Sequence, residues 1–221
     1  MIIAIDGSAA TGKSSVAKVV SEKLGFFHIN TGSMYRAVTF GLIESKISVN
    51  DNYAITDFIN SNNITFDDNN DIILNEINVS NKVHSIEVSS LVSKVSSIFS
   101  IRQWMVRLQR DIANHRDCVL EGRDIGTIVF PTAENKFFLV ANIKTRAMRR
   151  KKEMDSYGEF HSIDEITSNI LERDELDSNR EFSPLKKATD AFEIDTSDIK
   201  IEDVVKIIID KVKLKNKKEK F

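Results

Sequence analysis

Two glycines five residues apart, followed at once by a lysine and a serine, form the stretch of this chain best suited to chemistry. Gly7 and Gly12 let the backbone turn so that successive N–H groups point inward, toward an anion. Lys13 adds a positive charge, and the Ser14 hydroxyl can complete the coordination of a Mg²⁺ held by phosphate oxygens. The spacing predicts a phosphate-binding loop for a nucleoside triphosphate, made of Gly7, Ser8, Ala9, Ala10, Thr11, Gly12, Lys13, Ser14 and Ser15.

Such a loop needs a buried strand before it and a helix after it. Residues 2–5 are a short apolar run, and Val16, Val20 and Leu24 recur at helical spacing. A glycine-rich turn can match the pattern by chance, but it would not require these neighbours. The motif indicates a bound triphosphate and leaves its use open, because kinases, switches and motors share the loop.

Further charged residues follow other predicted strands, where parallel sheets bind ligands. Arg36 comes shortly after an apolar run at 26–29, and Arg123 and Asp124 follow the run 118–120. Charges at the end of a buried strand are costly unless they meet a ligand, which makes the segment 121–127 a second candidate site. Helices predicted after residue 141 and over 163–179 carry more of these charges, namely Arg146, Arg149, Arg150, Arg173, Asp177 and Arg180.

The order of these elements predicts the fold class. Five apolar strands alternate with helices, which is typical of an α/β protein with a doubly wound parallel sheet. Residues 49–92 differ: Asn and Asp clusters separate short apolar runs, and we expect a small antiparallel insert there. The polar segment 154–161, with Gly158, suits a mobile lid. The basic tail beyond Lys213 is expected to fray.

Composition excludes several classes of protein. With 31 basic and 33 acidic residues the net charge is -2, which gives no support to a nucleic-acid or membrane surface. The single cysteine, Cys118, excludes an internal disulfide and a four-cysteine zinc site. The first strand begins at Met1 and no apolar run approaches membrane-spanning length, so we expect a cytoplasmic protein.

Taken together, the motifs resemble those of the bacterial cytidylate kinases, a family of nucleoside monophosphate kinases. The resemblance covers nearly the whole chain and rests on GSAATGKS at 7–14, TGSMYR at 31–36, SKVSSIFSIR at 93–102, EGRDIGTIVFP at 121–131 and ERDELDSNR at 172–180. It implies ATP-dependent phosphorylation of CMP and dCMP by a monomer, with Mg²⁺ entering on ATP. It also implies a P-loop core (1–35, 93–148 and 162–221), a monophosphate-binding insert (36–92) and a short lid (149–161).

Transfer between two nucleotides gathers about six negative charges, so catalysis depends on positioning and charge neutralisation rather than on a general base. Arginine suits this task because its fork binds phosphate oxygens in pairs. We expect the catalytic set to be Lys13, Arg123, Arg150 and Arg180, with Arg149 on ATP. The resemblance implies that Arg36, Arg123 and Arg180 hold the acceptor phosphate and that Ser93, Arg173 and Asp177 approach the sugar.

The base would be read by a carboxylate, since cytosine carries an amino donor where uracil carries a carbonyl acceptor. Asp124 is the candidate, and the resemblance implies that Arg102, Thr31 and Tyr35 complete the substrate set. The family often has Ser where this chain has Thr31, which keeps the hydroxyl.

Each of these assignments has a plainer alternative. Arg173, Asp177 and Arg180 would also suit an ion-pair ladder on one helix face, and Asp124 would also suit a simple pair with Arg123. Residues 149–152 would suit a solvated face. Cys118 fits a core position, and His28, His84, His115 and His161 show no ligand spacing. For the whole chain, the alternatives are a kinase acting on AMP or UMP and a nucleotide-gated switch protein.

Overall fold

The structure is a computed structural model that describes residues 1–67, 69–156, 158 and 160–218. The chain divides into two compact units. Met1–His28 and Arg116–Phe221 make up the first unit, and Ile29–His115 make up the second. The second unit therefore includes more of the chain than the predicted insert 36–92.

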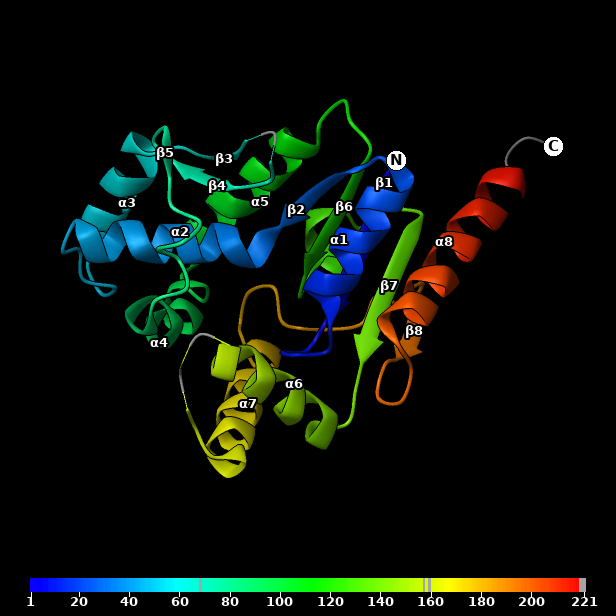
Figure 1. Cartoon of the computed structure of the whole chain (residues 1–221). Helices are drawn as coiled ribbons and strands as arrows, with labels where there is room; N and C mark the ends of the chain where they lie inside the picture. The colour runs from blue at the N-terminus through cyan, green and yellow to red at the C-terminus, as the bar shows by residue number, and fades with distance from the viewer. Residues whose placement is uncertain (68, 157, 159, 219–221) are drawn as a thin grey trace. The chain divides into compact units, whose positions relative to one another are not determined.

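A five-stranded parallel sheet has the strand order β2-β6-β1-β7-β8 (Figure 1). Its strand β1 lies in the middle, paired in parallel with β6 on one side and β7 on the other. The α/β prediction is confirmed, with each strand close to an apolar run of the sequence. The strands are β1 (Ile2–Gly7), β2 (Phe27–Asn30), β6 (Cys118–Gly122), β7 (Asn135–Val140) and β8 (Phe192–Asp195).

Helices α1 (Lys13–Leu24) and α8 (Ile201–Lys218) pack on the sheet through one apolar core. Ile3 and Ile5 of β1 meet Val16 and Val20 of α1 there, and Ile208 of α8 joins them, all at most 2% exposed. Gly25 ends α1 in the left-handed conformation, with φ of 69°, as its position predicts.

Helices α6 (Ile143–Ser156) and α7 (Ile163–Ser178) pack side by side in the first unit (Figure 1). Ser162 and Glu165 form a capping box that starts α7. Residues 149–156 of the predicted lid continue α6, and residues 157 and 159 lie outside the described residues. Helix α8 runs on past Lys213, where the sequence predicts fraying, and residues 219–221 also lie outside the described residues. No helix in the described part of the chain is both long and apolar enough to cross a membrane.

The second unit contains the predicted antiparallel sheet, with β4 between β3 and β5. The sequence prediction was wrong to omit helices here, because α3 lies within the Asn- and Asp-rich segment. Helix α2 begins at Thr31, where the Asn30 side chain caps it by accepting from Ser33 N. The elements are α2 (Thr31–Glu44), α3 (Asn52–Ser61), β3 (Ile64–Phe66), β4 (Ile72–Leu74), β5 (Ile77–Asn78), α4 (Ile86–Val95) and α5 (Phe99–Ala113).

Candidate active site

The predicted phosphate-binding loop connects β1 to α1 and depends on its two glycines. Gly7 has φ of 152°, and a Cβ there would lie 2.2 Å from the Leu139 carbonyl oxygen on β7, so no other residue fits. Gly12 has φ of 90° and immediately precedes α1. The loop therefore presents its backbone at the N-terminus of a twelve-residue helix, an arrangement suited to anions.

Lys13 is folded over this loop. Its Nζ lies 2.5 Å from the Ser8 carbonyl oxygen and 3.4 Å from Thr11 Oγ1, and the residue is only 6% exposed. Burial, and after it the charge of Arg123, holds the pKa of Lys13 well below its ordinary value, with Arg173 acting in the same direction. Three cationic side chains are thus close enough to influence one another, and a polyanion would relieve their repulsion.

The Ser14 hydroxyl is hydrogen-bonded to the carboxylate of Glu121, for which the sequence predicts no individual role. Its Oγ donates to Glu121 Oε2 at 2.6 Å, and His28 Nε2 lies 3.3 Å from Glu121 Oε1. Glu121 is 3% exposed at the end of β6. A hydroxyl and a carboxylate are oxygen ligands of the kind that Mg²⁺ binds, directly or through water.

The two neighbouring arginines of α6 have different surroundings. Arg149 Nη1 donates to the Thr11 carbonyl at 3.3 Å and to Thr196 Oγ1 at 3.0 Å, which joins α6 to the loop and to the end of β8. Arg150 Nη1 instead pairs with Glu153 Oε2 at 2.9 Å, one turn along the same helix. Arg149 therefore lies at the loop, whereas Arg150 makes the contact expected of a solvated helix face.

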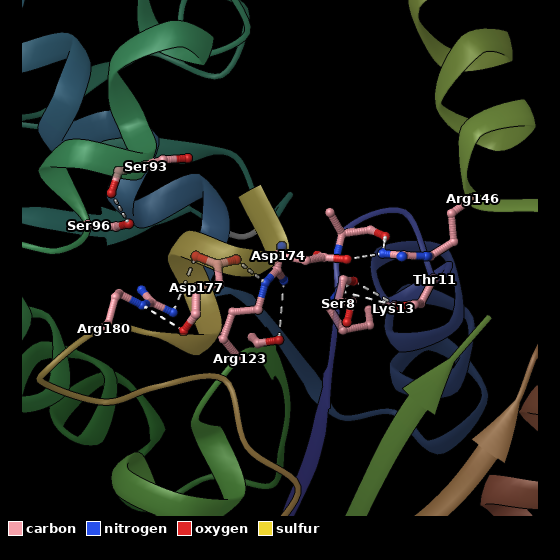
Figure 2. A network of polar contacts seen from close by, with 12 residues as sticks. Ser8, Thr11, Lys13, Ser93, Ser96, Arg123, Arg146, Asp174, Asp177 and Arg180 are labelled. Atoms are coloured by element: carbon pink, nitrogen blue, oxygen red, sulfur yellow. Dashed lines mark hydrogen bonds and ion pairs between the residues drawn. The ribbon is translucent and has the colours of Figure 1, made fainter. Parts of the chain in front are cut away.

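A second cluster of charges lies where β6 ends and α7 ends (Figure 2). Arg123 Nε donates to Asp177 Oδ2 at 2.8 Å, and Arg180 Nη2 lies 3.4 Å from Asp177 Oδ1. Burial alone would raise the pKa of Asp177, but the charges of Arg123, Arg180 and Arg173 hold it below its ordinary value. The alternative of an ion-pair ladder along one helix face accounts for the contact between Arg180 and Asp177. It does not account for the contact between Arg123 and Asp177, which are 54 residues apart in the sequence.

Asp124 is buried, at 5% exposed, and its carbonyl begins the π-helical segment η1 (Ile125–Val129). The backbone of that segment is held by another carboxylate, since Ile125 N and Gly126 N donate to Asp6 at 2.9 and 2.8 Å. Burial raises the pKa of Asp6 to about 6, although these two hydrogen bonds oppose the shift. Asp6 thus orients the backbone that follows Asp124.

Within the second unit, the predicted residues form two groups. Arg102 is 3% exposed, lies over the Tyr35 ring at 5.3 Å, and donates to the Ser96 carbonyl at 3.0 Å. Ser96 Oγ in turn donates to the Ser93 carbonyl at 2.9 Å. Arg36 belongs to the other group, with Nη1 donating to the Val83 carbonyl and to Ser89 Oγ. Thr31 is buried in the first turn of α2.

Comparisons with known proteins agree with these motifs. The family model described as "Cytidylate kinase" matches residues 3–214. The chain belongs to the cytidylate kinase family. A cytidylate kinase of Clostridioides difficile (strain 630) is 45% identical over 214 residues, which are 97% of this chain and 99% of that protein.

A cytidylate kinase of Halalkalibacterium halodurans is also 45% identical, over 216 residues that cover 96% of this chain and 97% of the relative. Among solved structures, a shikimate kinase from Bacteroides thetaiotaomicron aligns with a TM-score of 0.50 at 12% identity, over 96% of this chain and 98% of that one. At that identity the likeness concerns the fold alone.

Sequence reasoning about this cytidylate kinase family member assigned no role to four side chains that touch the predicted site, although it noted the charge of Arg146. Glu121 belongs to the segment 121–127 that the sequence singled out, so its position at a strand end was the available signal. Asp6 had the same signal at the end of β1. Asp174 and Arg146 contact Ala9 of the loop, and no local pattern predicts that contact.

Proposed function

We propose that this chain transfers the γ-phosphoryl group of ATP in line to the phosphate of CMP or dCMP. Cytidylate kinase activity follows from the family and from its close relatives. The observation that supports the detailed proposal is the grouping of Lys13 with Arg123 and Arg173, whose charges lower the Lys13 pKa together with burial. Phosphoryl transfer between nucleotides requires this concentration of positive charge.

For the donor, we propose that residues 7–15 bind the phosphates of ATP through backbone N–H groups and Lys13, and that Arg149 assists from α6. Mg²⁺ fits the oxygens of Ser14 and Glu121, which lie 2.6 Å apart. Held by these oxygens, the ion would supply positive charge against the negative charge that develops during transfer. His28 would orient Glu121 from the other side.

For the acceptor, we propose that Arg123 and Arg180 bind the phosphate of CMP, and that Arg173 and Asp177 contact the sugar. Asp177 holds both Arg123 and Arg180 in place before substrate arrives. Asp124 would accept from the amino group of cytosine. The remaining predicted roles are proposals of the same kind: Thr31 and Arg102 at the base, Tyr35 among the substrate-binding residues, Ser93 at the sugar, Arg36 at the phosphate and Arg150 in catalysis.

The chemistry balances without a general base. An oxygen of the ionised acceptor phosphate forms the new bond to the γ-phosphorus, and the bond from that phosphorus to the bridging oxygen breaks, releasing ADP. No proton has to move, so the side chains act by position and charge. A monomeric state and a cytoplasmic location remain predictions.

A coupled assay of ADP release tests this proposal. Purified protein with MgATP is compared with CMP, dCMP, UMP, AMP and no acceptor. We expect fast release with the two cytidine nucleotides and little with the others. Fast release with AMP or UMP would assign another acceptor, and slow release indifferent to every acceptor would indicate a nucleotide-gated switch protein.

A further inference from the structure

Helix α7 carries two carboxylates three residues apart that bind to different parts of the candidate site. Asp177 binds Arg123, which is proposed to hold the acceptor phosphate. Asp174 instead accepts from the backbone N–H of Ala9 in the phosphate-binding loop, with Oδ1 at 3.1 Å (Figure 2). The same turn of helix is therefore attached to the donor loop and to the acceptor cluster.

Arg146 of α6 completes the attachment to the loop. Its Nη1 donates to the Ala9 carbonyl at 3.2 Å and forms an ion pair with Asp174 Oδ2. Both polar groups at Ala9, its N–H and its carbonyl, are thus bound by one ion pair. Arg146 is 8% exposed, and a charge this far from water is retained only where paired contacts compensate its desolvation.

Apolar contacts also hold helices α6 and α7 against the phosphate-binding loop. Ala147 of α6 and Ile166 and Ile170 of α7 form a small hydrophobic core, each at most 4% exposed. Ala10, the next residue of the loop, packs against this core. The helix pair therefore meets the loop through adjacent polar and apolar contacts at residues 9 and 10.

We propose that Asp174 and Arg146 are positioning residues that hold α7 in a fixed position relative to the phosphate-binding loop. Because Arg173, Asp177 and Arg180 lie on or directly after α7, the position of α7 sets where the acceptor charges lie relative to the γ-phosphoryl group. The inference rests on the proposed function, since it assigns a geometric role within that phosphoryl transfer. Neither residue is proposed to touch a reacting atom.

A positioning role has a distinctive kinetic signature. Misplacement of reacting groups by about 1 Å costs on the order of 100-fold in rate, while each substrate still finds its own contacts. An interaction needed only for alignment lowers kcat and leaves each KM nearly unchanged. A residue that merely shapes the loop would instead change the KM for ATP.

The test compares Asp174→Asn, Arg146→Gln and the double variant with wild type, using MgATP and CMP. Glu175→Gln is the matched control, because Glu175 is an exposed acidic residue on the same helix. We expect kcat to fall by about 10- to 100-fold in each single variant with both KM values within about threefold. The double variant should be no slower than the slower single variant, because the pair acts as a unit.

Several outcomes would overturn the inference. A kcat equal to that of Glu175→Gln, a loss expressed mainly in the KM for ATP, or additive effects in the double variant would each do so. Should Asp174→Asn fail to fold, Arg146→Lys keeps the charge but not the forked geometry, and its kcat should lie between those of wild type and Arg146→Gln. Wild-type protein that does not phosphorylate CMP would refute the proposed function instead.

Discussion

Ser14 Oγ donates a 2.6 Å hydrogen bond to Glu121 Oε2, so the hydroxyl that follows Lys13 and the carboxylate next to the last residue of β6 form one group of oxygens. The sheet register explains the contact. Strand β6 pairs in parallel with β1, and Glu121 lies opposite Ile5, two residues before the loop begins at Gly7. A residue at the end of one strand thus reaches the helix that follows its neighbour.

Replacing Glu121 tests its proposed part in metal binding. Glu121→Gln keeps the shape of the side chain but removes the charge that is proposed to attract Mg²⁺. We expect the Mg²⁺ concentration for half-maximal rate to rise by about 10- to 100-fold with little change in the KM for CMP. Initial rates over a MgCl2 series at fixed ATP measure this. Glu22→Gln, on the exposed side of α1, is the control, and an unchanged Mg²⁺ requirement would remove Glu121 from the metal site.

Much of this arrangement is predictable because its signals are local. The glycine spacing around Lys13 predicts the phosphate-binding loop, and the apolar runs predict all five strands of the parallel sheet. Helix α3 was not predicted, because the polar residues at its two ends are also typical of turns. Asp51 accepts from Ala54 N at its start, and the Asn62 side chain donates to the Phe58 carbonyl at its end. Asn and Asp favour turns and also cap helices, so a cluster of these residues does not distinguish a turn from a helix end.

Contacts between distant segments were not predictable. Asp174 and Ala9 are 165 residues apart, and Ser14 and Glu121 are 107 apart. Periodicity shows which face of an element is apolar, but it does not show which polar side chain lies across from which. The side chains that contact the loop are therefore identified by the structure and not by the sequence. The roles assigned to individual site residues remain predictions.

Lys13→Ala should abolish transfer while leaving the fold intact. The lysine is proposed to neutralise charge on the transferred group, and removing such a contact costs about 100-fold or more in kcat. Because burial disfavours the charged amine, its removal should not lower the melting temperature. Turnover and circular dichroism of the variant are compared with those of Lys18→Ala, an exposed lysine on α1. Turnover equal to that of wild type would contradict the role of Lys13.

Asp124→Asn should weaken the preference for CMP over UMP. The amide can turn a donor toward the uracil carbonyl, and the carboxylate no longer repels it. We expect the ratio of the two kcat/KM values to fall by about 5- to 150-fold, which corresponds to roughly 1–3 kcal/mol per base contact. Asp198→Asn, at an exposed site before α8, controls for loss of charge. A ratio that stays at its wild-type value would assign base recognition to other residues.

Asp6 makes stability depend on pH in an unusual direction for a carboxylate. Its pKa is raised from 3.8 to about 6, so the folded state holds a proton that the unfolded state has lost between these values. Stability from this group is therefore present at low pH and lost as pH rises through about 6. Between pH 7.5 and 4.5 the wild-type protein should gain about 2 kcal/mol of unfolding free energy relative to Asp6→Asn, at about 1.4 kcal/mol per pKa unit.

Urea unfolding of both proteins at the two pH values measures this difference. The Asn side chain cannot ionise, so titrating groups that do not interact with Asp6 contribute equally to both proteins and cancel in the comparison. Asp177 contributes in the opposite direction, because its pKa is lowered, and the subtraction removes it as well. A difference between wild type and Asp6→Asn that is the same at both pH values would show that Asp6 ionises normally beneath the η1 backbone. The hydrogen bonds from Ile125 and Gly126 would then fully offset the cost of burial.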